Sequence, residues 1–353
     1  MAPDSNMVTI NDVAKAAGVS KGTVDRVIHN RGEVSAKSRE KVLRVIEELG
    51  YKPNMYASML ATHKKITICC IIPEYGEGDF WELAAKGIHE AEESVSRYGA
   101  VLEIVTYDQY DMDSFTQACL DALEKGPDGI VIAPIFHAET MAFTQEMSRR
   151  GISYAYIDSR LEEDQDYMAY FGMPMVQSGY LCADILTNEL PVERVYAIRI
   201  AHDKTKNSDQ TWPRRAGFVK YMSEHYPHAE IVNVVIDPKD ASKRFEQLDE
   251  AFSSDQGPKF ITMFNSRIHL VADYIRVRGM KDCRVVGFDC IERNLQALKD
   301  RVVHALIAQH MDRQTSAAVL ALVDKLIHGV EVSKKDHFTS MDILNRFNCD
   351  YYM

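Results

Sequence analysis

Polar side chains recur where apolar, strand-like runs end in the latter part of the chain. Asp158 lies at the end of ISYAYIDS, Asn265 follows KFITMF, Asp289 ends CRVVGFD and Gln309 lies in ALIAQHMD. In α/β proteins, ligands bind beyond the carboxyl ends of parallel strands, so we expect these side chains to converge. Carboxylate and amide groups suit paired hydrogen bonds to adjacent hydroxyl groups, although each alone is also typical of a helix cap. Their recurrence favours the binding of a sugar or a sugar acid.

Two arginines and an aromatic pair belong to the same candidate site. Arg160 follows Asp158 by two residues, and Arg214 lies early in the helix expected after the fifth strand. Guanidinium groups form charge-assisted hydrogen bonds with carboxylates and phosphates. An anionic ligand is therefore an alternative to a neutral sugar. Phe80 and Trp81 begin the helix after the first strand. Their rings either stack on the apolar face of a sugar or pack in the core, and the sequence favours neither.

The elements that must position these residues alternate between strand and helix from Ile66 onward. Near-continuous apolar runs, each followed by an amphipathic helix, indicate parallel sheets covered on both faces. The strand-like runs are 66–73, 101–108, 129–135, 152–159, 194–200, 230–237, 259–264 and 283–289.

This pattern is too long for one doubly wound sheet. We therefore predict a two-lobed α/β domain for ligand binding and dimerisation over 66–353, with a parallel sheet in each lobe. The first lobe is expected to span about 66–172 plus 310–332, and the second lobe 173–309 plus 333–353.

The formal charge of the 353-residue chain is −11, but it is spread unevenly. In residues 1–65, Lys and Arg outnumber Asp and Glu by 11 to 7, whereas acidic residues lead by 45 to 30 in the rest of the chain. An acidic chain is usually a poor partner for nucleic acid. Because the first 65 residues are basic and the rest is acidic, the N-terminal part is still a candidate for binding nucleic acid.

Residues 1–50 carry the start and stop signals of three short helices. Thr9, with Asp12 three residues later, forms a capping box, and Gly18 is typical of a helix C-terminus. Ser20 and Ser35 are expected N-caps of the second and third helices. The apolar stripes predict one shared core, made of Val13, Ala14, Ala17, Val19, Val24, Val27, Ile28, Val42, Val45, Ile46 and Leu49.

Two short helices joined by a tight turn predict a helix-turn-helix domain. The outer face of the second helix, which is then free to enter the major groove of DNA, carries Lys21, Gly22, Asp25, Arg26 and His29. The alternative is a small helical bundle whose outer face is only solvated. The close succession of cap, helix, glycine turn, capped helix and basic face favours DNA binding.

The run VTINDVAKAAGVSKGTVDRVIHNRGEVSAKSREKVLRVIEELGYKPN, Val8–Asn54, closely resembles the DNA-binding headpiece of the lactose/galactose repressor (LacI/GalR) family. The rest of the chain more weakly resembles that family's effector domain and the periplasmic sugar-binding proteins. The resemblance implies that Lys21 and Gly22 occupy base-reading positions and that Arg26 contacts guanine. The residues it implies for phosphate contacts or helix positioning are Thr9, Ser20, Thr23, Arg26, Asn30 and Ser35. Asp25 departs from the family's usual Ser, so no operator sequence is carried over.

Residues 51–65 form a polar connector in which Pro53 precedes about two turns of expected helix. Two isolated turns are unstable in water, so this segment is either a flexible linker or one that orders only on DNA. It resembles the family's hinge helix, in which Leu60 would wedge between bases in the minor groove and Ala57 would let two hinges approach. That arrangement implies a homodimer on a near-palindromic, double-stranded operator.

The resemblance extends to the candidate ligand residues. Arg214, Asn265, Asp289 and Gln309 match ligand contacts of the family, and Phe80 with Trp81 matches its paired aromatics. The loop EYGEGD lacks the Asn often found before the aromatic pair. The resemblance therefore implies a sugar-type effector without naming one.

The sequence also argues against other classes of protein. No apolar run reaches the ~18 residues of a membrane span, and the first residues lack the basic and apolar parts of a secretory signal. Seven cysteines without a CxxC pair fit reduced, buried thiols. We therefore predict a cytoplasmic protein that does not contact the membrane.

Motifs of nucleotide and hydrolase chemistry are missing, since no GxGxxG follows a strand and neither GxxxxGK[ST] nor GxSxG occurs. We therefore expect that the protein has no enzymatic activity, binds no cofactor and has no metal site. The sequence predicts a transcriptional regulator, expected to be a repressor, that responds to a small-molecule effector. The alternative is a solute-binding protein of a sugar transport system, which would need an export signal and no headpiece. An activator would use the same parts as a repressor.

Overall fold

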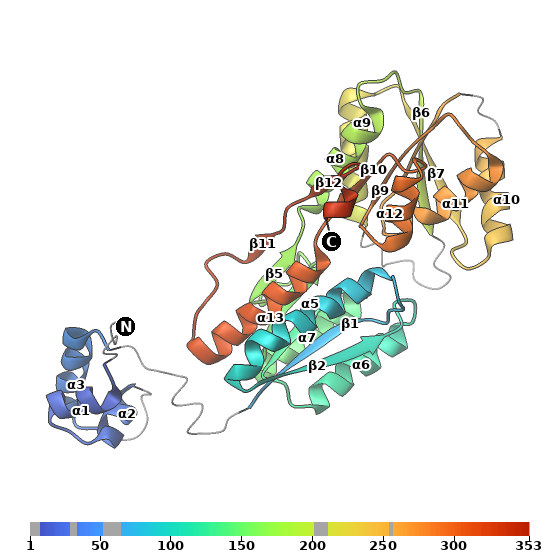
Figure 1. Ribbon diagram of the computed structural model, residues 1–353. Coiled ribbons are helices and arrows are strands. Elements are labelled where there is room, and N and C mark those ends of the chain that lie inside the picture. Colours follow the sequence, from blue (N-terminus) through green and yellow to red (C-terminus); the bar gives the residue numbers. More distant parts are fainter. Residues whose placement is uncertain (1–7, 29–33, 52–64, 201–210, 254–256, 353) are drawn as a thin grey trace. The chain divides into compact units, whose positions relative to one another are not determined.

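The computed structural model describes residues 8–28, 34–51, 65–200, 211–253 and 257–352. Contacts within the chain divide it into two compact units, Met1–Lys64 and Lys65–Met353. Figure 1 shows that the first unit is helical and that the second combines helices with two sheets.

The helical unit contains α1 (Ile10–Ala17), α2 (Lys21–Ile28) and α3 (Ala36–Leu49). The expected capping box is present, because Thr9 Oγ1 accepts from the Asp12 amide at 3.3 Å while the Asp12 carboxylate accepts from the Thr9 amide at 2.8 Å. Gly18 ends α1 at φ +60°, a conformation that other residues adopt at a cost. Ser20 accepts from the Thr23 amide at 3.1 Å, and Ser35 from the Ser38 amide at 3.3 Å. The predicted starts of all three helices are confirmed.

The core of the helical unit differs from the prediction at two positions. Its buried residues are Val13, Ala14, Ala17, Val24, Val27, Val42, Val45 and Tyr51. Leu49, which the apolar stripe of α3 placed in this core, is 39% exposed, so that prediction is wrong. The helix ends at Leu49, and the chain turns at Gly50 so that the Tyr51 amide donates to the Ile46 carbonyl at 3.0 Å. The turn buries Tyr51 and leaves Leu49 exposed in the last turn of α3.

The α/β unit is built on two six-stranded sheets. The first sheet has the order β11-β5-β4-β3-β1-β2 and the second β12-β10-β9-β8-β6-β7. Every strand pair is parallel except β10 with β12, which is antiparallel. The strands of the first sheet are β1 (Ile66–Pro73), β2 (Ala100–Tyr107), β3 (Gly129–Ile132), β4 (Ser153–Asp158), β5 (Ala169–Gly172) and β11 (Asp336–Phe338). Those of the second are β6 (Arg194–Ile200), β7 (Glu230–Ile236), β8 (Lys259–Met263), β9 (Cys283–Phe288), β10 (Ala305–Ala308) and β12 (Asp342–Leu344).

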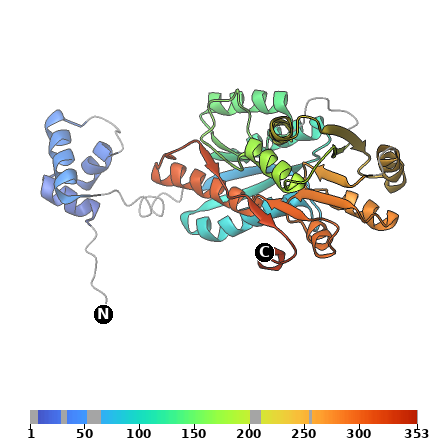
Figure 2. The same cartoon turned by 90° about the horizontal axis from the view of Figure 1, so that it is seen from above.

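Helices pack around each sheet, and Figure 2 shows them on both sides of the strands. We call the first sheet with its helices the first lobe; these helices are α5 (Phe80–Val95), α6 (Met112–Glu124), α7 (His137–Arg150) and α13 (Met311–His328). The second sheet with its helices is the second lobe; these helices are α8 (Met175–Thr187), α9 (Trp212–His225), α10 (Ala241–Phe252), α11 (His269–Arg278) and α12 (Glu292–Lys299). Two short 3-10 turns lie at Ser96–Tyr98 and Cys349–Tyr351.

The chain passes between the two sheets three times, after β5, after β10 and after β11. The last passage corrects one expectation, since we placed 333–353 in the second lobe. Instead β11 extends the first sheet by pairing with β5, and only β12 joins the second sheet. The four strands that the sequence did not predict (β5, β10, β11 and β12) have three or four residues each, and runs of that length carry only a weak strand signal.

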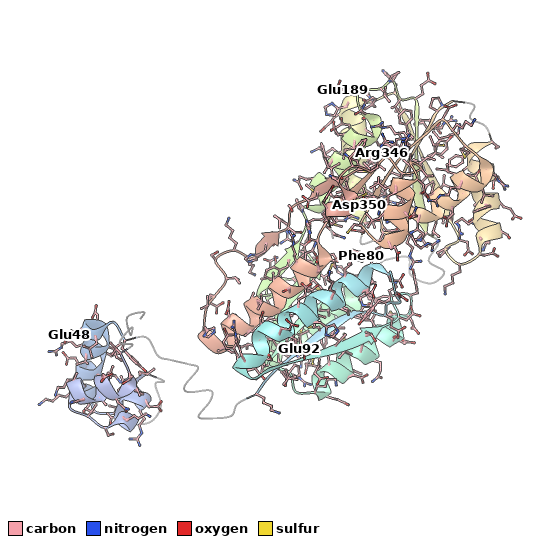
Figure 3. All side chains as sticks on the ribbon, in the orientation of Figure 1. Glu48, Phe80, Glu92, Glu189, Arg346 and Asp350 are labelled. Atoms are coloured by element: carbon pink, nitrogen blue, oxygen red, sulfur yellow. The ribbon has the colours of Figure 1, made fainter. Side chains whose placement is uncertain are left out.

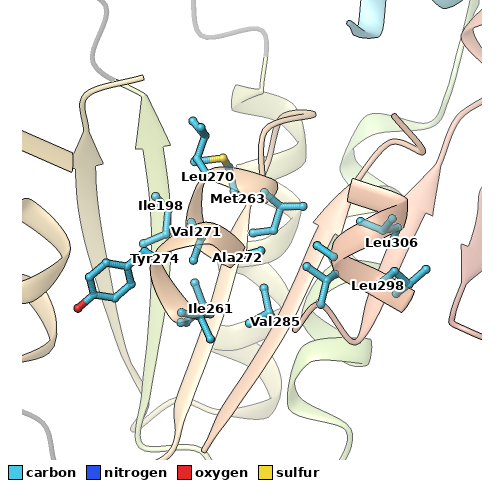
Figure 4. Packing of buried hydrophobic residues seen from close by; sticks show 14 of the residues in the cluster. Ile198, Ile261, Met263, Leu270, Val271, Ala272, Tyr274, Val285, Leu298 and Leu306 are labelled. Carbon is cyan, nitrogen blue, oxygen red and sulfur yellow. The ribbon is translucent and has the colours of Figure 1, made fainter. Parts of the chain in front are cut away.

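Apolar packing holds the second lobe together, as Figure 4 shows. Ile198, Ile261 and Val285 on neighbouring strands meet Val271 and Leu298 from the covering helices. All seven cysteines lie within the described residues as free thiols, five of them buried and two, Cys283 and Cys290, partly buried. Among the described helices, none has both the length and the apolar character that crossing a membrane requires.

Candidate functional site

A close helix crossing places Arg214 in the candidate site. Helices α8 and α9 meet at Gly179 and Gly217, where a Cβ atom would overlap the backbone carbonyl of Arg214 or of Val176. Only glycine permits this approach. It brings α9 near enough to α8 for Arg214 Nε to donate to Ser178 Oγ at 3.1 Å.

The Arg214 side chain is buried and held on several sides. Its Nη1 donates to the Phe264 carbonyl, and its guanidinium carbon lies 4.0 Å from the centre of the Phe288 ring. Its Nη2 lies 3.0 Å from the Met173 sulfur and 3.5 Å from the Met175 sulfur. Because these groups already occupy much of the guanidinium, Arg214 contributes mainly a fixed positive charge.

Two aspartates from different lobes face this charge. Asp158 ends β4 in the first lobe, and Asp289 follows β9 in the second; both are buried. Their φ angles of +64° and +66° lie in the left-handed region, which aspartate tolerates better than most residues. His310, which follows β10, shares this conformation at φ +55°. Residues held in this way are frequent at functional sites.

Hydrogen bonds fix both aspartates. The Tyr170 hydroxyl donates to the Asp158 carbonyl at 2.8 Å, and the Asp158 amide donates to Gln314 Oε1 at 3.3 Å. In the second lobe, Gln309 Nε2 donates to Asp289 Oδ1 at 3.0 Å. We call Asp158, Arg214, Asp289 and Gln309 the polar cluster.

Burial raises the pKa values of both aspartates in the polar cluster above the ordinary value of an aspartate. Burial raises the pKa of Asp158 to about 6, and the charge of Arg214 opposes this rise. Burial raises the pKa of Asp289 to about 7, where Arg214 again opposes and the neighbouring Asp158 adds to the rise. The same loss of water lowers the pKa of Arg214, against the attraction of Asp289 and Asp158.

One acceptor in the polar cluster has no partner within the described chain. Gln309 Oε1 is buried and receives no hydrogen bond there, whereas its Nε2 is engaged with Asp289. A buried acceptor without a donor costs about 1–3 kcal/mol. A ligand hydroxyl would supply that donor, and the two carboxylates would accept from further hydroxyls.

Within the described residues, four of the predicted ligand residues make no hydrogen bond or ring contact with the polar cluster. Asn265 Oδ1 accepts from the Arg267 amide at 3.0 Å, and Arg160 Nη1 donates to Asp336 at 2.8 Å and to the Tyr167 hydroxyl at 2.7 Å. Phe80 and Trp81 form an edge-to-face pair with ring centres 5.1 Å apart.

The aromatic pair is divided between the two expected roles, packing in the core and stacking on a sugar. Trp81 is only 6% exposed, as expected of a packing residue, while Phe80 is half-buried. Figure 3 places Phe80 at the end of α5 that faces the second lobe.

The residues that hold the polar cluster were not predicted. Tyr170 lies on β5, a strand too short to be recognised from its sequence, and Gln314 lies within α13. Ser178 precedes the close-contact Gly179 on α8, and a Ser-Gly pair inside a helical pattern is the one signal that could have indicated a tight crossing there.

A pocket of about 660 Å³ lies between the lobes and borders the polar cluster, because its lining residues Met173, Met175 and Tyr170 also contact Arg214 or Asp158. Of the predicted ligand residues, only Arg160 lines it. The wall residues are Pro134, Ile135, His137, Ser159, Arg160, Leu161, Glu162, Glu163, Tyr170, Met173, Pro174, Met175, Val176, Gln177, Trp212, Pro213, Ala216 and Phe338.

In the helical unit, the predicted DNA-contacting face of α2 is accessible. Lys21, Gly22 and Arg26 are exposed, and Thr23 and Asp25 are half-buried. The capping residues Thr9, Ser20 and Ser35 are exposed as well. Three further predicted residues, Asn30, Ala57 and Leu60, lie outside the described residues, as does His29.

A helix-turn-helix unit joined to a two-lobed α/β unit defines a DNA-binding regulator of transcription with a ligand-binding domain. Known proteins agree with this class. Residues 9–54 match the bacterial regulatory proteins of the lacI family, and residues 68–329 match a periplasmic binding protein domain. The chain is 30% identical to the HTH-type transcriptional regulator DegA of Bacillus subtilis over 287 residues, which is 80% of this chain and 81% of DegA. The chain belongs to the LacI family, and it is a transcriptional regulator.

Solved structures match the α/β unit. A structure described as a LacI transcriptional regulator from Bacteroides fragilis is 32% identical, with a TM-score of 0.76, and the match covers 82% of this chain and all of that one. An ABC transporter solute-binding protein from Burkholderia graminis, in complex with D-arabinose, has a TM-score of 0.71 at 20% identity, covering 82% of this chain and 98% of that one. At that identity the second match shows the fold alone.

Proposed function

We propose that this regulator is a repressor that binds a near-palindromic operator as a homodimer, with a small sugar or sugar acid in the interlobe cleft controlling its affinity for DNA. The observation that carries the effector proposal is the polar cluster. Its carboxylates come from both lobes, and Gln309 Oε1 is a buried acceptor awaiting a donor. The vicinal hydroxyl groups of a sugar supply several such donors close together.

The effector would couple the two lobes because it would contact both of them. Asp158 belongs to the first lobe, whereas Asp289 and Gln309 belong to the second. A ligand bridging these groups favours one lobe angle, and a ligand shifts an equilibrium only by its differential affinity for the two states. Tenfold control of DNA affinity requires a coupling of about 1.4 kcal/mol, within the usual range for allostery.

In this proposal the exposed face of α2 reads DNA in the major groove. Lys21 and Arg26 are the side chains suited to guanine, and Gly22 makes no side-chain contact. Thr9, Ser20, Thr23, Asn30 and Ser35 contact phosphates or position the helices, while Asp25 accepts from a cytosine amino group or pairs with a neighbouring cation. Ala57 and Leu60 form the minor-groove hinge of the dimer, and Asn265, Arg160, Phe80 and Trp81 border the effector.

The proposed effector class is tested by a thermal-shift screen of monosaccharides and sugar acids, followed by calorimetry on each hit. Gln309→Leu removes the unpaired acceptor at nearly constant size, so we expect at least tenfold weaker binding of the hit. Gln296→Leu is the matched control, because Gln296 is an exposed residue of α12 that bonds to Asp300. Equal affinity of the wild type and Gln309→Leu would remove the polar cluster from the effector site.

The alternative is a solute-binding protein of a transport system, which shares the fold. A DNA-binding measurement distinguishes it from a regulator. A transport protein would show no preference for any duplex. We expect the full chain to retain a specific duplex selected from random sequences and to lose it steeply as salt rises.

A further inference from the structure

Two side chains tie together the three passages of the chain between the lobes. These passages start at Gly172, where β5 ends, at Gln309 after β10 and at Thr339 after β11. The Thr339 amide donates to the Gly172 carbonyl at 2.8 Å, and the Thr339 hydroxyl lies 3.1 Å from the same oxygen. That hydroxyl also lies 2.9 Å from the Gln309 carbonyl oxygen. Gln314 is the second side chain, and its Nε2 donates to the Gln309 carbonyl at 2.7 Å and to Thr339 Oγ1 at 3.3 Å. We call Gln314 and Thr339 the hinge pair.

The hinge pair is also bonded to the polar cluster. Gln314 Oε1 accepts from the Asp158 amide at 3.3 Å, while Gln314 Nε2 donates to the Gln309 carbonyl. Asp158 ends β4 in the first lobe, whereas Gln309 follows β10 in the second lobe. One side-chain amide therefore holds the backbones of two cluster residues that come from different lobes.

The surroundings of Gln314 fix its position relative to the first lobe. Its side chain is completely buried in the first turn of α13, and this helix packs against β3, β4 and β5 of the first sheet. Its Nε2 makes two hydrogen bonds and its Oε1 one, so both ends of the amide are engaged. A buried polar network that is satisfied in this way is rigid and specifies one arrangement. Gln314 therefore determines where Gln309 of the second lobe lies relative to the first sheet.

A further contact joins the second and third passages close to the second lobe. His310 Nε2 and Asp342 Oδ2 lie 2.6 Å apart, which links the residue after Gln309 to the first residue of β12. His310 is buried, and its φ of +55° lies in the left-handed region. Such a conformation persists where the surrounding contacts hold it. The two passages are thus tied at two places, so they bend together when the lobe angle changes.

We propose that Gln314 and Thr339 are positioning residues of the interlobe hinge, which set the lobe angle of the ligand-free protein and transmit a displacement of Asp158 or Gln309 to the three passages. The inference deepens the proposed function and rests on it for the effector, but not for the ligand-free lobe angle. A ligand that changes the relation between Asp158 and Gln309 has to change their bonds to Gln314. Because a ligand acts only through its differential affinity for the two lobe angles, a hinge that no longer holds the ligand-free angle responds less.

Thr339→Val and Thr339→Ser are a matched pair for the test. Valine keeps the shape of threonine and lacks the hydroxyl that contacts the passages, whereas serine keeps that hydroxyl. Gln314→Met removes the amide contacts at nearly the same side-chain length. Thr116→Val is the control, because Thr116 is exposed on α6 and its hydroxyl donates to a carbonyl of the same helix at 3.0 Å. Circular dichroism confirms that each variant is folded.

The ligand-free lobe angle is measured in the full chain by energy transfer between two dyes. The dyes are attached to p-acetylphenylalanine introduced at Glu92 on α5 and at Lys220 on α9, which are exposed positions of different lobes. A large excess of unlabelled protein ensures that the transfer occurs within one chain. We expect a shifted or broader distribution of transfer efficiency in Thr339→Val and Gln314→Met, and the wild-type distribution in Thr339→Ser and Thr116→Val. The wild-type distribution in both hinge variants, or the same change in Thr339→Ser, overturns the proposal.

The response to a ligand separates transmission from binding. With a hit from the sugar screen, Thr339→Val should bind the ligand within about threefold of the wild-type affinity, because every side chain of the polar cluster is retained. The ligand-induced change in operator affinity should shrink by about threefold or more. A lower free energy of unfolding with an unchanged response would mean a purely structural role and would overturn the proposal, while leaving the effector proposal intact. If no sugar binds the wild type, the effector proposal fails, and the dye measurement alone decides the role of the hinge pair.

Discussion

Gln309 Nε2 donates to Asp289 Oδ1 at 3.0 Å, which joins the residue that follows β10 to the residue that follows β9. This bond orients the Gln309 amide so that its Oε1 remains a buried acceptor without a partner in the described chain. The charges of Arg214 and of Asp158 in the other lobe both act on the Asp289 carboxyl, so the bond holds a group that senses both lobes. The predictions for the α/β unit follow from this arrangement.

The raised pKa of Asp289 predicts a specific dependence of stability on pH. An aspartate in an unfolded chain has a pKa near ~4, whereas burial raises the pKa of Asp289 to about 7. Between these values the folded protein binds more protons than the unfolded chain, so the free energy of unfolding falls as pH rises. Asp289→Asn removes this titration. Relative to wild type, the variant should gain about 2 kcal/mol between pH 5 and pH 8, measured by urea unfolding.

Asp237→Asn is the control for that measurement. Hydrogen bonds from the Asp240 and Lys239 amides lower the pKa of Asp237 to about 2, so this residue titrates below the pH range used. Its difference from wild type should be the same at pH 5 and pH 8. A constant difference for Asp289→Asn as well would show that Asp289 does not titrate in this range.

The crossing of α8 and α9 predicts that the α/β unit tolerates no side chain at Gly179. A methyl group there would overlap the Arg214 carbonyl, so Gly179→Ala should lower the free energy of unfolding by about 2 kcal/mol or more. Gly22→Ala is the matched control in α2, where the nearest atom to the added methyl is Ser20 Oγ at 3.9 Å. That variant should stabilise its helix by up to about 1 kcal/mol. An unchanged melting temperature for Gly179→Ala would show that the helices can separate.

Arg26 is predicted to carry sequence preference on the exposed face of α2. If it contacts guanine, Arg26→Ala should lose about 1–3 kcal/mol of affinity for a selected duplex and much less for random DNA. Fluorescence anisotropy at two salt concentrations measures both. Arg97→Ala, in the α/β unit, removes the same charge and should leave DNA binding unchanged. An equal loss on both DNAs would make Arg26 a phosphate contact.

Leu60, outside the described residues, is predicted from the resemblance of its segment to act as a minor-groove wedge. Leu60→Ala should weaken operator binding about tenfold while leaving ligand binding intact, because unstacking a base step requires an apolar side chain of sufficient size. Leu43→Ala, at an exposed position of α3, is the control. Operator affinity equal to that of wild type would remove the wedge role from Leu60.

The sequence predicted the fold to the extent that each element carried a local signal. Thr9, Ser20 and Ser35 start helices by accepting hydrogen bonds from nearby backbone amides through their side-chain oxygens. Gly18 ends a helix through its left-handed backbone, and the structure confirms these boundaries. The long strands are also local features, because their apolar runs are continuous. By contrast, β11 depends on a partner strand more than 160 residues earlier in the chain, and no local pattern indicates such a pairing.

The candidate site also combines residues that a local pattern predicts with contacts that depend on distant parts of the sequence. Asp158 and Asp289 could be predicted because both stand where apolar strands end. The contacts that hold them could not, since Tyr170 and Gln314 reach Asp158 only through the three-dimensional packing of β5 and α13. The tolerance of Arg214 for burial likewise depends on Ser178 and the Phe264 carbonyl, which lie 36 and 50 residues away in sequence.

The central claim is that a ligand held by the polar cluster changes operator affinity, and titrating the ligand against the protein–operator complex tests it most directly. The operator would be a duplex selected from random sequences, the ligand a hit from the sugar screen, and the readout fluorescence anisotropy. We expect the wild-type dissociation constant to change about tenfold, which is ~1.4 kcal/mol, whereas Asp289→Ala should bind the operator normally and show no response. No change in the wild type, or a full response in Asp289→Ala, would contradict the account.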